Sequence, residues 1–288
     1  ANSSSLNNSE IRYNICSNGK VLTSLLIFKE IEKGNLNLDG AAASYLNSED
    51  YFQGLEQISI RQLLNHTSGL GDFFESPEYQ EENINTVSTL YPLVQRMPVT
   101  KNQPLEFLHY SNSGFIVLGK ILERIHLKPY EQILQEELLL PLGIDLTVKK
   151  SYAQGWIKDE ENWKLGLGNN PESWSSAGGV FLSPTELHQV LSALNAGKIL
   201  SKNSIETMWA ISSRPEHNPP FVGYGLGWMI EQPKNLRFIG HNGGIPGFQS
   251  GFRYLPESNT YIYVFSNRDG GAEKIFMTAI MQLIEKAE

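Results

Sequence analysis

The sequence predicts an α+β fold in which an antiparallel sheet is flanked by helices and carries an inserted, mainly helical lobe. Apolar residues recur at helical spacing through the middle of the chain. Short β-branched and aromatic segments then follow one another near its end. We therefore expect a single domain over residues 1–288. Its helical lobe covers about 40–170, and its α/β lobe covers about 1–39 plus 171–288.

The first predicted helix covers residues 17–33 and stops at Gly34, because glycine commonly ends a helix. Its apolar residues recur at helical spacing: Val21, Leu22, Leu25, Leu26 and Ile31. Three more helices are predicted in the middle of the chain. Their segments are ISIRQLLNHTSGLGDF, which runs into a glycine-rich turn, NSGFIVLGKILERIH and YEQILQEELLLPLG.

Consecutive antiparallel strands are predicted from four short segments separated by turn residues. These segments are YGLGWMIE, LRFIGHNG, FQSGFRYLP and TYIYVFSN. The segment AEKIFMTAIMQLIEKA has helical periodicity and predicts a closing amphipathic helix. The polar opening, ANSSSLNNSE, predicts a flexible arm.

Charge and composition argue against several classes of partner. The formal net charge of −8 does not favour nucleic acid or an anionic membrane, since both attract clustered lysine and arginine. No apolar run reaches the roughly 18 residues that a membrane span needs. The single cysteine excludes an internal disulfide and a cysteine-cluster metal site. The chain begins Ala-Asn-Ser without methionine, which predicts a processed product whose targeting signal has been removed.

The segment ICSNGKVLTSLL is the first candidate for chemistry, and three interpretations compete. A phosphate-binding loop ending at Lys20 fails, because that motif needs glycine where Asn14 stands and serine or threonine where Val21 stands. A thiol nucleophile, Cys16, stays open because it lies near a helix start. Lone cysteines beside apolar residues are, however, mostly small core residues.

The third interpretation is a serine nucleophile with a lysine partner. Ser17 lies at the predicted helix N-terminus, where the dipole and free N–H groups favour developing negative charge. Lys20 follows one turn later on the same face. If its amine is desolvated, its pKa falls and it can accept the serine proton. S-x-x-K also occurs by chance, so further residues must support this interpretation.

Two later motifs supply polar groups. In HYSNSGF, Tyr110 and Asn112 are two residues apart, so an extended turn points both side chains into one cleft. The phenol can relay a proton, and the amide can bind a substrate carbonyl or hold the lysine. In GHNGGIPGF, His241 stands at the end of a predicted strand, followed by glycines that allow close approach to the backbone.

The set S-x-x-K, Y-x-N and H-x-G, in this order, resembles the serine penicillin-recognising enzymes. The similarity is to the branch of class C β-lactamases, D-Ala-D-Ala carboxypeptidases and related esterases and D-aminopeptidases. It runs from about residue 13 to the C-terminus. Four further segments carry it: GKVLTSLLIFKEIEKGNLNLD, IRQLLNHTSGL, SSAGGVFLSPTELHQVLSAL and YGLGW followed by GHNGGIPGFQSGFRYLP.

The resemblance implies a role for each motif residue. Ser17 is then the acyl nucleophile, Lys20 its base or proton relay, and Tyr110 the partner acid and base. Asn112 contacts the substrate amide, and His241 takes the place of the lysine in related β-lactamases. Gly243 and Gly244 complete the substrate-binding set, with the oxyanion held by the backbone N–H groups of Ser17 and Gly244.

This chain also departs from the family. Only sixteen residues precede Ser17, where the family has a helix and two strands. We therefore expect these strands to be missing from the sheet, or to have been removed before this chain was made. The third motif offers Asn242 and Gly244 where carboxypeptidases have hydroxyl residues that hold a substrate carboxylate.

The expected function is that of a serine hydrolase acting through an acyl-enzyme on small esters or D-amino-acid peptides, with weak or no β-lactamase activity. The alternative is a non-catalytic protein of the same fold that binds peptides or a partner. The family implies a periplasmic or secreted location. We expect neither a metal nor another cofactor, since the histidines lack ligand spacing and His66 is expected to pack or to cap a turn.

Overall fold

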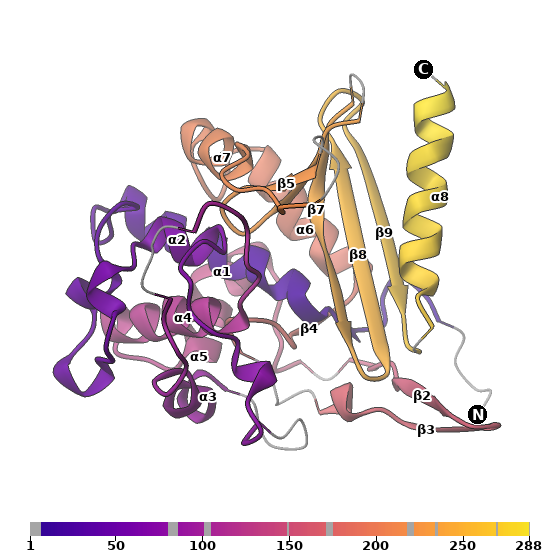
Figure 1. Cartoon of the computed structure of the whole chain (residues 1–288). Coiled ribbons are helices and arrows are strands. Elements are labelled where there is room, and N and C mark those ends of the chain that lie inside the picture. The colour runs from indigo at the N-terminus through magenta and orange to yellow at the C-terminus, as the bar shows by residue number, and fades with distance from the viewer. Residues whose placement is uncertain are drawn as a thin grey trace.

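The protein is described by a computed structural model, in which a group of helices lies beside a five-stranded antiparallel sheet (Figure 1). The helix α8 covers the far face of that sheet (Figure 1). This arrangement confirms the predicted α+β fold. The structure describes residues 7–79, 86–100, 105–148, 150–170, 175–217, 222–233, 236–268 and 270–287.

The helix predicted over residues 17–33 is confirmed, but it begins with a tighter turn. The short strand β1 (Tyr13–Asn14) leads into the 3₁₀ turn η1 (Cys16–Asn18), and α1 (Gly19–Glu32) follows directly. Gly34 ends this region with a φ of 79°, a left-handed conformation that glycine adopts without strain. Most residues of α1 are buried, because other elements surround the helix.

Four α-helices make up the helical group beside α1: α2 (Ile60–Leu64), α3 (Val87–Val94), α4 (Asn112–His126) and α5 (Tyr130–Leu134). The predicted span of α4 is confirmed in full, and α2 is shorter than its predicted segment. The segment after α5 widens into a π-helical turn and then tightens into a 3₁₀ turn, where Pro141 has no backbone N–H to donate. The short turns are η2 (Ala42–Tyr45), η3 (Ser48–Asp50), η4 (Leu55–Gln57), η5 (Phe73–Glu75), η6 (Gln135–Leu139) and η7 (Leu140–Leu142).

The main sheet has the strand order β5-β6-β7-β8-β9, with every neighbouring pair antiparallel. The segments predicted for the last three strands are confirmed, whereas YGLGWMIE forms two strands rather than one. It turns between them, where Gly227 has a φ of 89°. The strands are β5 (Val222–Tyr224), β6 (Met229–Glu231), β7 (Phe238–Ile245), β8 (Phe248–Leu255) and β9 (Thr260–Ser266).

The remaining elements frame the sheet. β1 pairs with β4 (Phe181–Leu182), and a separate hairpin joins β2 (Trp156–Asp159) to β3 (Asn162–Leu165). Within the described residues, β9 pairs with β8 alone. Figure 1 shows α6 and α8 on opposite sides of the sheet. The other elements are η8 (Leu167–Asn169), α6 (Pro184–Asn195), α7 (Lys202–Trp209) and α8 (Ala272–Ala287).

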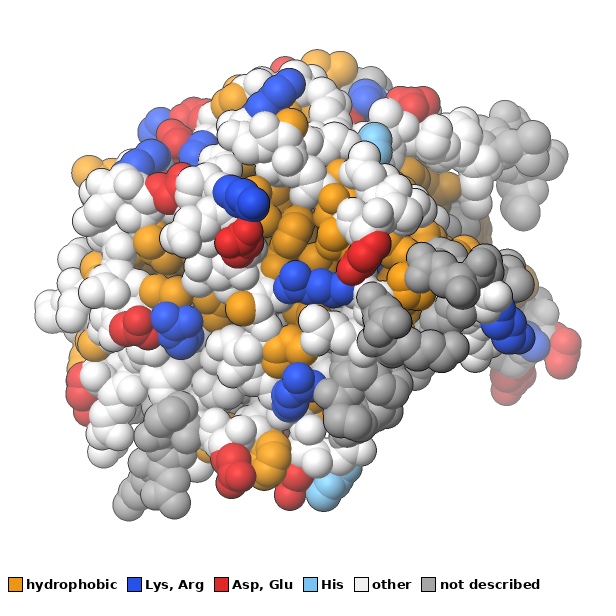
Figure 2. Space-filling view, turned by 90° about the horizontal axis from the view of Figure 1, so that it is seen from above, with side chains coloured by type: hydrophobic (Ala, Val, Ile, Leu, Met, Phe, Trp, Pro, Cys, Tyr) orange, Lys and Arg blue, Asp and Glu red, His pale blue; other side chains and the backbone are white. Residues whose placement is uncertain are grey.

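One apolar core joins the helical group to the inner face of the sheet. It includes Leu22 of α1, Phe115 of α4, Ile239 of β7 and Phe252 of β8, all fully buried. On the face seen from above, lysine and arginine side chains are interspersed with acidic ones around gathered hydrophobic side chains (Figure 2). None of the helices, as far as the chain is described, is both long and apolar enough to cross a bilayer.

Candidate active site

Ser17 lies where the helical group meets the sheet, in the turn η1 that precedes α1. Strand β7 passes directly beside this turn. A Cβ atom placed on Gly243 would lie 2.6 Å from the Cβ of Cys16 and 2.7 Å from the backbone nitrogen of Ser17. Cys16 itself has a φ of 51°, an uncommon conformation for a residue with a side chain. The backbone around Ser17 is therefore sharply turned and pressed against the sheet.

Asn18 fixes the turn to strand β8. Its Nδ2 donates to the carbonyl oxygen of Ile15 at 2.9 Å and to Oγ of Ser250 at 2.7 Å. The hydroxyl of Ser250 donates to the same carbonyl at 2.7 Å. These buried hydrogen bonds are shielded from water, so they hold the turn that carries Ser17 in one geometry.

Lys20 is 0% exposed and lies one turn after Ser17. Its Nζ donates to Oγ of Ser17 at 3.2 Å, to Oδ1 of Asn112 at 2.7 Å and to the carbonyl oxygen of Ala177 at 2.6 Å. Burial lowers the pKa of Lys20 to about 7, although the negative charge of Asp72 acts in the opposite direction. A substantial share of the amine is therefore neutral near pH 7 and can accept a proton.

Asn112 is held in place by Asp72, a residue that the sequence analysis missed. The carboxylate oxygen Oδ2 of Asp72 accepts from the backbone N–H of Asn112 at 3.1 Å and from its Nδ2 at 2.8 Å. The amide group is thereby oriented so that its oxygen meets Lys20. Asp72 also caps the first turn of α4, where a negative charge is favourable. In the sequence, the only feature that pointed to Asp72 as a site residue was its position directly after the glycine-rich turn SGLG.

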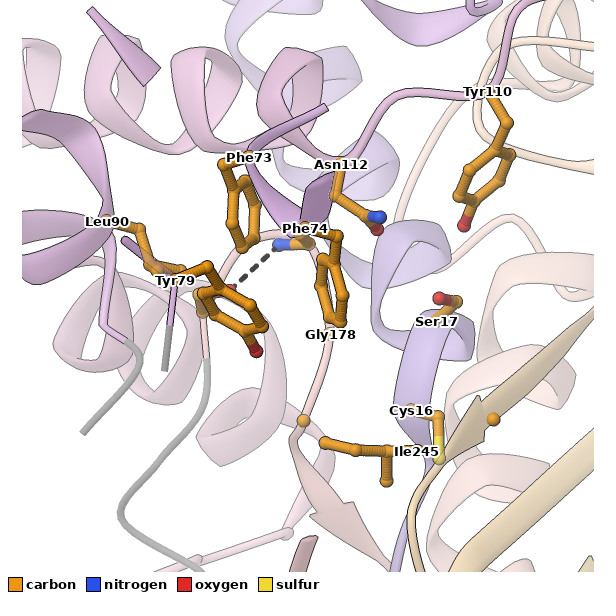
Figure 3. Close-up of a pocket in the computed structure, with 14 residues that line it drawn as sticks. Cys16, Ser17, Phe73, Phe74, Tyr79, Leu90, Tyr110, Asn112, Gly178 and Ile245 are labelled. Atoms are coloured by element: carbon orange, nitrogen blue, oxygen red, sulfur yellow. Dashed lines mark hydrogen bonds between the residues drawn. The ribbon is translucent and has the colours of Figure 1, made fainter. Parts of the chain in front are cut away.

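Tyr110 and Asn112 both reach the same pocket, as predicted, because Ser111 between them is extended, with a φ of −141°. The ring of Tyr110 packs against His66 at a tilt, with 4.2 Å between centroids, and Nζ of Lys20 lies 5.0 Å from the Tyr110 centroid. Figure 3 shows its hydroxyl end directed toward Ser17. Desolvation raises the pKa of Tyr110, and the hydrogen bond with Ser17 offsets this only in part, so the phenol keeps its proton at neutral pH.

His241 does not line the cavity beside Ser17, so the structure gives no support to its predicted binding role. It is 2% exposed, its Nε2 pairs with the hydroxyl of Tyr224 at 2.8 Å, and its Nδ1 pairs with the carbonyl oxygen of Asn242 at 2.5 Å. Burial and the nearby Lys20 lower the pKa of His241 to about 3. It is therefore a neutral, buried residue beneath the site.

The remaining residues considered in the sequence differ in whether they line the pocket. Gly243 does not line the pocket, and its role is the close packing against Ser17 described above. Gly244 does line it, with open space where a Cβ would be. Asn242 turns its Oδ1 toward Nη1 of Arg253, 2.9 Å away. The prediction that His66 packs or caps is confirmed, since its buried ring accepts from the backbone N–H of Ser111 at 3.2 Å.

These residues surround a cavity of about 330 Å³. Ser17 and Tyr110 lie on one side of it, and aromatic side chains lie on the other (Figure 3). The lining residues are Cys16, Ser17, Phe73, Phe74, Tyr79, Leu90, Tyr110, Asn112, Ser175, Ala177, Gly178, Gly179, Gly244 and Ile245. A hydroxyl, a desolvated amine and a protonated phenol therefore meet at a cavity large enough for a small substrate.

Known structures share this architecture. A penicillin-binding protein from Bacillus halodurans superposes with a TM-score of 0.84 at 25% identity, covering 96% of this chain and 87% of that one. The D-amino acid amidase of Ochrobactrum anthropi SV3, complexed with D-phenylalanine, has a TM-score of 0.78 and covers 99% and 95% of the two chains. At 24% identity, the second likeness concerns the fold alone.

Sequence comparison agrees with the structural one. The chain is 27% identical to penicillin-binding protein 4* of Bacillus subtilis, over 95% of this chain and 64% of that protein. It is 26% identical to protein flp of Staphylococcus aureus, over 89% and 53%. The chain thus spans between half and two thirds of these relatives' lengths. The family model described as Beta-lactamase matches residues 4–284, and the chain therefore belongs to the beta-lactamase family.

Proposed function

We propose that this chain is a serine hydrolase that forms an acyl-enzyme at Ser17 on small esters, or on amides and peptides of the D-amino-acid type. The observation that supports this most strongly is the contact between Ser17 Oγ and Nζ of Lys20, 3.2 Å apart, where burial lowers the pKa of Lys20 to about 7. A neutral amine at this distance is a competent base for a serine hydroxyl.

In the first half-reaction, neutral Lys20 accepts the proton of Ser17, and Oγ attacks the substrate carbonyl carbon. The backbone N–H groups of Ser17 and Gly244 face the resulting oxyanion. The tetrahedral intermediate then expels the leaving group, which takes a proton from the phenol of Tyr110. Tyr110 regains a proton from the Lys20 ammonium, so the acyl-enzyme forms with the site's proton count restored.

The second half-reaction repeats these steps with water as the nucleophile. Tyr110 takes a proton from the attacking water as it passes its own to neutral Lys20, and the acyl bond to Ser17 breaks. The Lys20 ammonium then returns a proton to the Ser17 oxygen as the acid product leaves. Because one pair of groups serves both halves, the chain needs no separate glutamate to activate the water.

The proposed substrate range follows from the third motif. Asn242 is engaged by Arg253, and both ring nitrogens of His241 have partners in the protein. Neither side chain lines the cavity, so we expect neither to hold the carboxylate of a β-lactam or of a C-terminal D-alanine, and we expect weak or no β-lactamase activity. We also propose an exported, periplasmic or secreted location, on the strength of the family membership.

Ser17→Ala tests the proposed nucleophile. Removing Oγ is expected to lower kcat for p-nitrophenyl acetate or butyrate by about 10³-fold or more, with the fold intact by circular dichroism. Wild-type protein should gain the mass of one phosphonyl group at Ser17 from a fluorophosphonate, and Ser17→Ala should not. Turnover that survives in Ser17→Ala would show that another group is the nucleophile.

The same labelling addresses the alternative of a non-catalytic binding protein. Asn18 and Gly19 within the nucleophile turn are the sequence features that prompted this alternative. In the structure both have packing roles: Asn18 ties the turn to Ser250, and a Cβ on Gly19 would lie 2.9 Å from Cα of Gly178. A wild-type chain that neither a fluorophosphonate nor a penicillin labels would favour the binding role.

A further inference from the structure

One side of the cavity is a wall of aromatic rings that the proposed mechanism does not use. The ring centroids of Phe73, Phe74 and Tyr79 lie 4.6–5.2 Å from one another. Phe73 is 1% exposed and Leu90 is 3% exposed, so these two form the base of the wall. Phe74 is 43% exposed although it lines the cavity, and Tyr79 is partly exposed beside it.

The position of this wall relative to the nucleophile determines what it can contact. Figure 3 shows the aromatic side chains across the cavity from Ser17 and Tyr110, with the ring of Phe74 toward the middle. A substrate whose carbonyl carbon meets Ser17 Oγ would therefore extend its next group toward Phe74 and Tyr79. Covering exposed aromatic surface with an apolar group is favourable, and ring-on-ring contact adds to that.

Charge gives an independent argument about the same group. Among the described residues that line the cavity, none is Lys, Arg, His, Asp or Glu. Lys20, next to it, is 0% exposed and already donates to three oxygen atoms. Arg253 forms an ion pair with Glu231 at 2.9 Å and is 2% exposed. A carboxylate placed against this wall would lose water without gaining a cationic partner among these residues.

We propose that this site selects substrates that carry a bulky, uncharged and preferably aromatic group beside the scissile carbonyl, and that it disfavours a carboxylate there. Phe74 and Tyr79 are the specificity-determining residues, and Phe73 and Leu90 support them from beneath. The proposal rests on the proposed acyl-enzyme function, and it names the substrate class of that same site.

Two matched pairs of p-nitrophenyl esters test the preference of the wild-type protein. The first pair is phenylacetate against acetate, and the second is valerate against the glutarate monoester, which has a similar length but ends in a carboxylate. Each kcat/KM is divided by the spontaneous hydrolysis rate of its ester. We expect the phenyl and the neutral ester to be preferred by about 10-fold or more, the range for a well-filled apolar pocket.

Variants then locate the preference. In Phe74→Ala and Tyr79→Ala, the phenylacetate-to-acetate ratio should fall by about 10-fold, because the phenyl group loses more contact than the methyl group. Phe74→Leu, which keeps apolar bulk but loses the ring, should give an intermediate ratio. Trp163→Ala is the matched control, since Trp163 is an exposed aromatic residue on β3 outside the cavity, and its ratio should stay at the wild-type value.

The outcomes separate the two proposals. Acetate turnover with a labelled Ser17, but with no preference in wild type or an unchanged ratio in both alanine variants, would overturn the aromatic selectivity and leave the hydrolase intact. A wild-type preference for the glutarate monoester would overturn it as well. No turnover of any of the four esters and no fluorophosphonate label would remove the hydrolase and the selectivity together.

Discussion

Lys20 carries a titratable proton at the centre of the site, and its charge state controls whether Ser17 can be activated. Its pKa of about 7 means that the amine is mostly protonated below that pH and mostly neutral above it. Proton acceptance requires the neutral form, so kcat/KM should rise as the pH rises through about 7 and then level off. The pKa of His241 is lowered to about 3, so this residue does not contribute to the rise of kcat/KM near pH 7, which is called the acid limb below.

Asp72→Asn tests the electrostatic part of this account. The Asp72 charge raises the pKa of Lys20, so removing that charge should move the acid limb of kcat/KM to lower pH. The plateau should also fall, because Asn112 is held less firmly. The measurement is the pH profile of p-nitrophenyl ester hydrolysis. Glu75→Gln, an exposed acid of the same turn, is the control and should leave the limb unmoved.

A limb that stays at the wild-type position in Asp72→Asn would mean that Asp72 only orients Asn112. A limb that moves to higher pH would contradict the sign of its effect on Lys20. Both results differ from simple unfolding, which lowers the rate at every pH without moving the limb.

Individual residues differ in how far the sequence could predict them. Spacing predicted that Ser17 and Lys20 share one helix face and that Tyr110 and Asn112 point into one cleft, since helical and extended geometry determine where such neighbours point. Only the family resemblance joined the two pairs, because Lys20 and Asn112 are 92 residues apart in the chain. His241 lies outside the lining of the cavity, and spacing does not reveal the partners of its two nitrogens, the Tyr224 hydroxyl and the Asn242 carbonyl. Asp72 was missed because its partner is forty residues away in the chain.

The contact between β7 and η1 sets the position of the nucleophile at the scale of elements. A side chain at position 243 would overlap the Cβ of Cys16 and the nitrogen of Ser17, because its own Cβ would lie 2.6 Å and 2.7 Å from these atoms. Gly243→Ala should therefore displace Ser17 and lower kcat/KM by about 10²-fold, the usual result of a misplaced reacting group. Gly244→Ala is the neighbouring comparison, because nothing lies within 4 Å of its Cβ position.

The two glycine variants are compared by ester kinetics and by circular dichroism. The prediction requires a clearly larger loss in Gly243→Ala than in Gly244→Ala while both remain folded. Equal losses would show that the strand β7 can shift away from η1 without cost to the site, and the packing argument would then be wrong.

Element types were predictable where local signals were strong and undisturbed. The helix α4 combines apolar periodicity with an extended residue before its first turn, and its predicted span is confirmed. In YGLGWMIE the glycines were predicted to lie along one strand. Gly227 instead lies in a turn that packs closely against Ser24, because a Cβ atom placed on Gly227 would lie 2.7 Å from the Cβ of Ser24. That turn depends on a contact with α1, so the local pattern alone did not contain it.

The whole molecule places the site between two groups of elements that share one core. Ser17 and Lys20 come from the η1–α1 segment, Tyr110 from the segment before α4, and Gly244 from the sheet. Leu22, Phe115 and Phe252 belong to the same buried cluster. Because the core is continuous, we expect the helical group and the sheet to unfold together rather than as separate lobes.

A ligand that contacts both groups should therefore stabilise the whole chain. Ser17 Oγ should add to the boron of phenylboronic acid as its proton passes to neutral Lys20, which gives a tetrahedral adduct with its ring in the aromatic half of the cavity. At about 100 times its Kd, it should raise Tm by roughly 5 °C in a single transition, measured by scanning calorimetry. Ser17→Ala lacks the oxygen that binds boron and should show no rise. An equal rise in that variant would place the boronate elsewhere, and a transition that splits in two would show that the two groups of elements do not share their stability.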